Sequence, residues 1–170
     1  MSSDPTPGEK RLLPDCPLGI LENGEPAFVQ ASAVFGRGLG LLVGMPGAFT
    51  PVCSQHHLPG LIARRPRLRE LGVDTVAVVT NDNPWVLDRW RAEHPEAGDI
   101  LFLSDANEAL LRALGLSTRM ADLSLGTVAS RFTAVVRDMV IEDLTVESDP
   151  RQLMCTAADA AVERLQPRAA

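Results

Sequence analysis

One cysteine of this sequence stands where a thiol becomes a nucleophile. Residues 46–53 read Pro-Gly-Ala-Phe-Thr-Pro-Val-Cys, directly after an apolar run at 39–45 that is typical of a buried strand. This order puts Cys53 in the first turn of a helix, with Thr50 three residues before it and Pro46 seven before it. Unpaired backbone N–H groups and the positive end of the helix dipole favour an anion there, which biases the thiol toward the reactive thiolate. The pattern therefore predicts chemistry at a sulfur atom.

A metal site is one alternative for this cysteine. Cys53 and His56 form a Cys-x-x-His pair followed directly by His57, but no second pair with the spacing of a zinc site is present. We expect His57 to cap or brace the helix instead. A glycine-rich nucleotide fingerprint is also absent from the sequence. We therefore expect neither a metal nor an organic cofactor.

The composition is that of a globular protein. The chain has 170 residues, of which 45% are hydrophobic and 22% charged, enough for one well-cored domain and small for two. We expect a flexible tail at 1–10 and a single domain over 11–170. The apolar runs are too short to cross a bilayer, so no membrane contact is expected. A net charge of −6 without a run of Lys or Arg argues against nucleic acid as a partner.

Three cysteines indicate a reducing compartment. Cys16, Cys53 and Cys155 are too few and too scattered for a disulfide framework, and the N-terminus has no hydrophobic segment of signal-peptide type. We therefore expect a cytoplasmic protein with catalytic, redox or inert buried thiols. Cys16 lies in a proline-flanked loop without a partner motif, and we expect it to be incidental.

Strand and helix signals alternate along the chain. Apolar runs predict buried strands, and turn or capping residues predict a helix after each of them. The strands are expected at 39–45, 73–79 and 100–103, and the helices at 51–71, around 85–90 and around 110–114. Pro59 and Pro66 fall within the first helix, so we expect that helix to be kinked or broken before Gly72 ends it.

Two hairpins and a final helix complete the pattern. Asn23-Gly24 is a hairpin turn signal, and Asp138-Met139 is expected to join two further strands. These strands are expected at 131–137 and 140–146, and an amphipathic helix at 157–165. Strand–helix alternation followed by a hairpin and a closing helix predicts an α/β fold with a mixed central β-sheet flanked by helices.

The segment from Pro46 to Ser54, continued by the motif His57-Leu-Pro-Gly60, resembles the active-site signature of the peroxiredoxins, most closely the peroxiredoxin-5-like subfamily. The resemblance covers nearly the whole chain, about 18–165. Further matching motifs are Asn81-Asp82 with Trp90, Ser104-Asp105, Asp122-Leu123-Ser124, Arg131-Phe132 and Val146-Glu147. The resemblance implies a thioredoxin-like fold and a thiol peroxidase that reduces hydrogen peroxide and small organic hydroperoxides.

The resemblance also implies roles around the reacting sulfur. Cys53 matches the peroxidatic cysteine, whose thiolate attacks a peroxide oxygen and becomes a sulfenic acid. Thr50 matches the residue whose hydroxyl bonds the thiolate and the peroxide, and Pro46 the residue that shields the pocket from water. Arg131 matches the arginine that supports the thiolate and the charge that develops during attack. The family often has another arginine three residues earlier, where this chain has Val128.

Cys155 is the candidate for the second thiol, which resolves the sulfenic acid. It lies nine residues after Val146, the offset at which some peroxiredoxin-5-like enzymes carry their resolving cysteine. Others carry it in the second buried strand, where this chain has Val78. The resemblance thus implies an intramolecular Cys53–Cys155 disulfide that thioredoxin or glutaredoxin reduces. The loop at 148–154 lacks the glycines common there, so we expect it to flex less.

Other interpretations of the same sulfur stay open. In a one-cysteine peroxidase, an external thiol such as glutathione would resolve the sulfenic acid. A peroxide sensor or holdase would use the same oxidation to capture a client protein. A disulfide oxidoreductase is disfavoured, because His56 stands where a Cys-x-x-Cys motif needs its second cysteine. The resemblance also implies a homodimer that contacts near the active-site loops.

Overall fold

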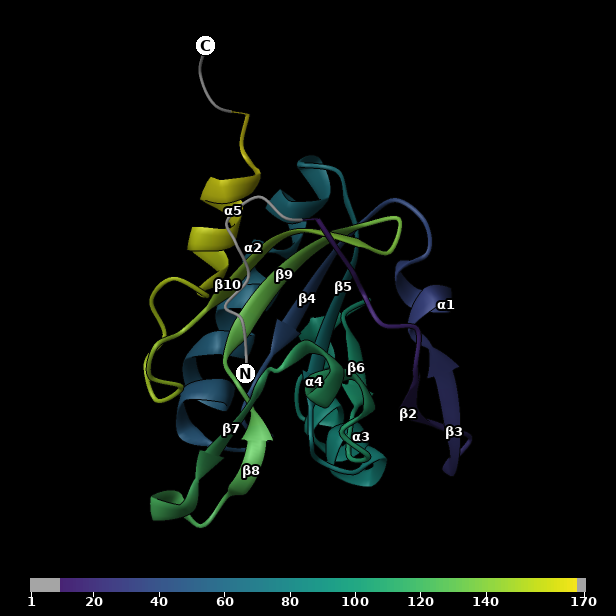
Figure 1. Ribbon diagram of the computed structural model, residues 1–170, viewed down its shortest axis with the longest axis vertical. Helices are drawn as coiled ribbons and strands as arrows, with labels where there is room; N and C mark the ends of the chain where they lie inside the picture. Colours follow the sequence, from purple (N-terminus) through teal and green to yellow (C-terminus); the bar gives the residue numbers. More distant parts are fainter. Residues whose placement is uncertain (1–9, 168–170) are drawn as a thin grey trace.

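The computed structural model describes residues 10–167, which fold around an eight-stranded sheet (Figure 1). The strands of this sheet are β1 (Arg11–Leu12), β2 (Pro17–Glu22), β3 (Glu25–Gln30), β4 (Leu39–Gly44), β5 (Val73–Thr80), β6 (Leu101–Ser104), β9 (Phe132–Arg137) and β10 (Val140–Val146). Their order is β1-β10-β9-β4-β5-β6-β2-β3. β4, β5 and β6 run parallel, whereas β9 is antiparallel to both β4 and β10. The predicted mixed central sheet is confirmed.

Helices cover both faces of this sheet. They are α1 (Ala31–Phe35), α2 (Leu58–Glu70), α3 (Pro84–Ala92), α4 (Ala109–Leu114) and α5 (Ala158–Leu165), with a π-helical segment η1 (Cys53–His57) and the short 3-10 turns η2 (Pro95–Ala97) and η3 (Ala121–Leu123). Figure 1 shows α5 beside α2 on one side of the sheet and α1 on the other. Within residues 10–167, no helix has the length and apolar content that a membrane span needs.

The sheet separates two core layers, and side chains of the central strand β4 point alternately into each of them. Leu41 and Val43 are fully buried in the cluster that includes side chains of α2, α3 and α5. Leu42 points the opposite way, into the cluster that includes α1 and α4, as the two-residue period of a strand requires. Gly44 faces this second cluster, where an added Cβ would lie 2.0 Å from the Phe132 ring. The strand therefore needs glycine at the position where β9 packs most closely.

The two predicted hairpin turns are confirmed, and α3 has a side-chain cap. Asn23 and Gly24 adopt φ of 54° and 82° between β2 and β3, and Asp138 and Met139 adopt 48° and 67° between β9 and β10. Positive φ at both central residues is the signature of the two-residue turn that matches the twist of paired strands. The Asn83 side chain accepts a hydrogen bond from the Val86 N–H and so caps α3.

The long helix predicted at 51–71 forms, but it does not break at a proline. Its irregularity lies at η1, where the Leu58 N–H donates to the Cys53 carbonyl in a π-type bond. Pro59 stands two residues after η1 and Pro66 lies inside α2, and the helical backbone runs through both prolines. Gly72, with φ of 88°, follows the helix end as predicted.

Four short elements carry no sequence signal that predicts them. β1 has two residues and α1 five. β7 (Ser117–Met120) and β8 (Gly126–Ala129) form a separate two-stranded sheet. Their four-residue stretches are too short and too polar to show a period.

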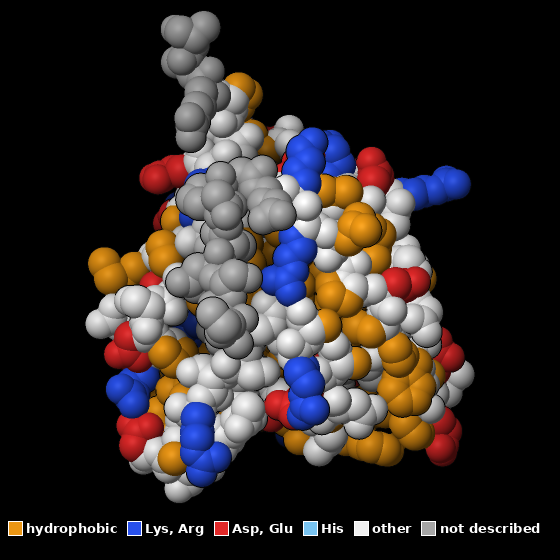
Figure 2. Space-filling view, in the orientation of Figure 1, with side chains coloured by type: hydrophobic (Ala, Val, Ile, Leu, Met, Phe, Trp, Pro, Cys, Tyr) orange, Lys and Arg blue, Asp and Glu red, His pale blue; other side chains and the backbone are white. Residues whose placement is uncertain are grey.

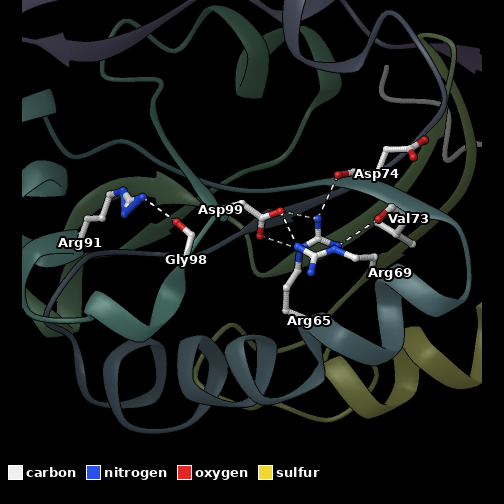
Figure 3. Close-up of polar contacts among 7 residues, drawn as sticks. All are labelled: Arg65, Arg69, Val73, Asp74, Arg91, Gly98 and Asp99. Atoms are coloured by element: carbon white, nitrogen blue, oxygen red, sulfur yellow. Dashed lines mark hydrogen bonds and ion pairs between the residues drawn. The ribbon is translucent and has the colours of Figure 1, made fainter.

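A buried arginine ties α2 to the strands on its side of the sheet (Figure 3). Arg65 donates to the carbonyls of Val73 and Asp74 at 3.0 Å and forms a two-pronged pair with Asp99 at 2.9 Å. Hydrogen bonds from Arg65, joined by one from Arg69, lower the pKa of Asp99 to about 2. This network is structural and lies apart from Cys53. On the face drawn in Figure 2, basic and acidic side chains are interspersed rather than gathered into one charged surface.

Candidate active site

The sheet register brings two distant residues together. β4 ends at Gly44, and the antiparallel strand β9 begins opposite it with Phe132. Arg131 directly precedes β9, so it lies beside the segment that leads from β4 to Cys53. The site therefore forms at the carboxyl end of a central strand, where α/β sheets commonly place functional groups. The pairing of β4 with β9 thus brings together Cys53 and Arg131, which are 78 residues apart in the sequence.

The Arg131 guanidinium contacts the Cys53 sulfur. Its Nη2 lies 3.4 Å from Cys53 Sγ, its Nη1 lies 3.0 Å from His57 Nδ1, and its Nε donates to the Pro150 carbonyl at 2.8 Å. Cys53 is 0% exposed and Arg131 2% exposed. A planar guanidinium with three fixed partners cannot swing away from the sulfur without breaking all of them. The buried cation stabilises negative charge on that sulfur.

His57 is a neutral brace between Arg131 and the C-terminal loop. Arginine has no acceptor, so the Nδ1 atom of His57 must carry the lone pair that meets Arg131. The other ring nitrogen, Nε2, then carries the proton and donates to the Thr156 carbonyl at 3.1 Å. Burial, followed by the charge of Arg131, lowers the pKa of His57 from 6.5 to about 3. The imidazole is therefore uncharged at neutral pH.

The buried His57 predicts a loss of stability in mild acid. The unfolded chain protonates this histidine below pH 6.5, whereas the folded chain resists protonation down to about 3. Stability from this group is thus complete above pH 6.5 and falls with pH through that window, by about 1–2 kcal/mol between pH 7 and pH 5. Urea unfolding at the two pH values measures it. In His57→Asn, whose carbonyl can still accept from Arg131, this part of the pH dependence should vanish, whereas His56→Asn, at an exposed position, should retain it. Equal pH dependence in His57→Asn and the parent would contradict the assignment.

The turn before Cys53 is fixed by a carboxylate from the neighbouring strand end. The Asp82 side chain accepts from the Ala48 N–H at 2.7 Å and from the Thr80 hydroxyl at 2.8 Å. Phe49 sits in the left-handed region with φ of 62°, a strained conformation for a bulky residue. The Thr50 carbonyl accepts from the Ser54 N–H at 2.9 Å, which opens the helix.

The structure places the remaining candidates around this centre. Pro46 is buried at the start of the turn. The Thr50 hydroxyl donates to the Gly47 carbonyl at 2.6 Å, so it turns toward its own loop, and its bond to the Cys53 sulfur stays a prediction. Cys155 is exposed, with Sγ 3.7 Å from the Val146 carbonyl.

Cys16 differs from the other thiols. It is buried in the second core cluster, on the α1 and α4 side of the sheet. Burial, helped by the charges of Asp105 and Asp15, raises its pKa to about 11. A thiol of this kind stays protonated and unreactive at neutral pH.

The sequence did not reveal the contacts of two supporting residues. His57 was expected to brace the helix, but its contact with Arg131 was not anticipated, although its position four residues after Cys53 puts both on one helical face. Asp82 belonged to a matching motif without an assigned task, and it proves to hold the active-site turn. Among residues 10–167, no group of three or more His, Cys, Asp or Glu side chains is arranged to hold a metal ion.

Comparisons with known proteins agree with this site. A family model described as Redoxin matches residues 8–162. Peroxiredoxin-2C of Oryza sativa subsp. japonica is 35% identical over 138 residues, which cover 79% of this chain and 84% of the relative. The solved structure of reduced Prx3 from Vibrio vulnificus in complex with hydrogen peroxide has a TM-score of 0.83 at 29% identity, over 92% of this chain and 97% of that chain. Peroxiredoxin 5 from Alvinella pompejana, with a TM-score of 0.78 at 21% identity over 91% and 95% of the two chains, shares the fold.

The expected fold and activity are confirmed by these matches. A buried cysteine that contacts a buried arginine fits the nucleophile and the cation that peroxide reduction needs. The chain belongs to the Redoxin family: it is a peroxiredoxin, a thiol-dependent peroxidase with a thioredoxin-like fold.

Proposed function

We propose that Cys53 is the peroxidatic residue and that Arg131 is its main electrostatic support. The observation that carries this assignment is the 3.4 Å contact between Arg131 Nη2 and Cys53 Sγ inside a buried site. The thiolate attacks one peroxide oxygen, an S–O bond forms as the O–O bond breaks, and the other oxygen takes a proton and leaves as water or an alcohol. Sulfur is oxidised by two electrons to sulfenic acid, and the peroxide is reduced.

Thr50 and Pro46 complete the proposed pocket. The Thr50 hydroxyl donates to the Gly47 carbonyl and would redirect its proton to bond the sulfur and the bound peroxide. Pro46 has no N–H group to hold water and is buried beside the turn. Fixed donors along the line of attack stabilise charge that spreads over sulfur and both oxygens.

Cys155 is the proposed resolving residue. Its thiol attacks the sulfenic sulfur of Cys53, an S–S bond forms, the S–O bond breaks, and the hydroxyl leaves with the thiol proton as water. A dithiol protein such as thioredoxin or glutaredoxin then reduces the disulfide. Two features support this scheme: the exposure of Cys155, and the contact of both Arg131 and His57 with the loop that carries it.

Cys155→Ser separates the two-cysteine scheme from the one-cysteine scheme. After one equivalent of peroxide, non-reducing mass spectrometry should show an internal disulfide in the parent, and persistent sulfenic acid or a glutathione adduct in the variant. Turnover with thioredoxin should fall by at least about tenfold, because the internal resolving step is lost. Cys16→Ser is the control and should form the Cys53–Cys155 disulfide normally. The same products in the parent and in Cys155→Ser would refute the resolving role.

Sustained turnover distinguishes an enzyme from a sensor. Many cycles with thioredoxin and its reductase support the recycling proposed above, whereas a single oxidation followed by stable capture of a partner protein supports a sensor or holdase.

We also propose a homodimer, which the exposed ring of Phe49 on the active-site turn supports. Sedimentation measures the oligomeric state. A cytoplasmic location stays a prediction, to be tested by fractionation.

A further inference from the structure

One carboxylate pins the chain on both sides of Cys155. Glu147 lies at the end of β10 and is 8% exposed. Its Oε1 atom accepts from the Met154 N–H at 2.7 Å, the Thr156 N–H at 2.9 Å and the Thr156 hydroxyl at 2.8 Å. The donors are the residues immediately before and after Cys155. The loop from 147 to 156 is thereby closed on itself by a single side chain.

The two sulfurs have different surroundings when the loop is closed. Cys53 is buried, whereas Cys155 is exposed and neither is in a disulfide. The Arg131 guanidinium contacts Cys53 with one nitrogen and the Pro150 carbonyl with another, and His57 reaches the Thr156 carbonyl. These two buried side chains thus connect the peroxidatic helix to the closed loop. Disulfide formation must bring an exposed sulfur to a buried one, and opening of this loop would provide that movement.

Glu147 holds this loop through three hydrogen bonds to one charged oxygen. Burial opposes its charge, but the N–H groups of Thr156 and Met154 together lower the pKa of Glu147 below its ordinary value. The carboxylate is therefore ionised at neutral pH, and hydrogen bonds to a charged acceptor are the stronger kind. Arg164 adds one exposed contact, from Nη1 to the Cys155 carbonyl at 2.8 Å.

We infer that Glu147 is a positioning residue for the resolving step: it latches the 147–156 loop, and release of this latch sets the rate at which Cys155 reaches the Cys53 sulfenic acid. The inference rests on the proposed resolving role of Cys155. The step itself forms the S–S bond, breaks the S–O bond and releases water, as given above. Glu147 acts on the opening of the loop and exchanges no electron or proton with the reacting sulfurs.

The Glu147 latch also affects the reactivity of the Cys155 sulfur. Burial, followed by the hydrogen bond and the charge of Glu147, raises the pKa of Cys155 above its ordinary value. In the closed loop Cys155 is therefore held as a thiol, the poorer nucleophile. Opening the loop moves the sulfur away from the carboxylate, so reach and reactivity increase together.

A graded series of variants tests the latch. Glu147→Gln keeps a neutral acceptor in the same place, Thr156→Val removes one of the three donors at nearly constant volume, and Glu147→Ala removes the acceptor. Stopped-flow fluorescence separates oxidation of Cys53, whose rate rises with peroxide concentration, from resolution, whose rate does not. We expect resolution to be faster by about threefold in Glu147→Gln and Thr156→Val and by about tenfold or more in Glu147→Ala. The ratio of the resolution rate to the oxidation rate should rise in the same order.

A second readout is independent of fluorescence. Excess peroxide converts the sulfenic acid to sulfinic acid unless resolution comes first. The peroxide concentration that gives half-conversion to sulfinic acid should therefore rise with the resolution rate. Glu142→Gln, a carboxylate removed from the same strand in an ion pair with Arg137, is the matched control and should match the parent.

The outcomes separate this inference from the proposed function. A resolution phase that persists in Cys155→Ser overturns the resolving role itself. A phase that is lost in Cys155→Ser but is unchanged or slower in Glu147→Gln and Thr156→Val overturns the latch alone. If Glu147→Ala does not fold, the two conservative variants decide the question.

Discussion

Replacing Cys53 by serine is expected to abolish peroxide reduction. A serine hydroxyl is not ionised near neutral pH and cannot form a sulfenic acid, so turnover should fall by about 10³-fold or more. Removal of hydrogen peroxide in the presence of thioredoxin and its reductase measures the loss. Because the site is buried and the two side chains are similar in size, the variant should still fold.

The control for this loss is another cysteine. Cys16 lies on the far side of the sheet, and Cys16→Ser should retain the peroxidase rate. If Cys53→Ser kept its rate while another single cysteine variant lost it, the nucleophile would be wrongly assigned. The contact between Arg131 and Cys53 would then have only a structural meaning.

Arg131→Met is expected to lower kcat/KM for hydroperoxide by about 10²–10³-fold, the cost typical of losing one fixed donor at a site of developing charge. The substitution also leaves His57 Nδ1 and the Pro150 carbonyl without their partner, which should lower the free energy of unfolding by about 1–3 kcal/mol. Arg131→Lys should lie between, because lysine restores the charge but cannot reach three partners at once. Steady-state kinetics at a temperature where all three proteins are folded gives the comparison.

Arg137→Met is the matched control for this substitution. Arg137 lies at the other end of β9 in a surface pair with Glu142, and its loss should leave kcat/KM within about twofold of the parent. Equal losses in the two variants would mean that any arginine on this strand matters in the same way. The proposal that Arg131 specifically supports the Cys53 sulfur would then be refuted.

The parts of the fold that the sequence predicts are those fixed by local physics. Long apolar runs identified β4 and most of β5, because burial on both faces favours apolar residues at successive positions of a strand. Asn23-Gly24 and Asp138-Met139 identified two hairpin turns, because few residues tolerate positive φ. α1 and the hairpin of β7 and β8 were missed, since they are too short to show a period and are held by tertiary packing.

The site divides in the same way. Cys53 and its helix follow from the motif after β4, and Arg131 follows from a resemblance that the register of β4 and β9 explains. The direction of the Thr50 hydroxyl is a rotamer choice that no sequence pattern encodes. The hydrogen bonds to Glu147 depend on the directions of the backbone N–H groups in the 147–156 loop. A sequence pattern does not encode these directions.

The proline prediction shows how tertiary context changes a local rule. Pro59 and Pro66 predicted a kinked or broken helix, yet the helical backbone is continuous, and its irregularity is the π-helical turn that begins at Cys53. Segments of this type often mark functional positions in helices. The irregular turn therefore begins at the reacting residue and ends two residues before Pro59.

The central claim is that the buried Arg131 guanidinium increases the rate at which the Cys53 sulfur reacts with peroxide. The most direct test is the second-order rate constant for oxidation of Cys53 by hydrogen peroxide in a Cys16→Ser/Cys155→Ser background, with and without Arg131→Met. Trp90, which donates to the Ser54 hydroxyl beside Cys53, provides the fluorescence signal. A rate far above that of an ordinary exposed thiol, falling by about 10²-fold or more in Arg131→Met, is the predicted result. An ordinary rate in the parent, or an equal rate in both proteins, would contradict the account.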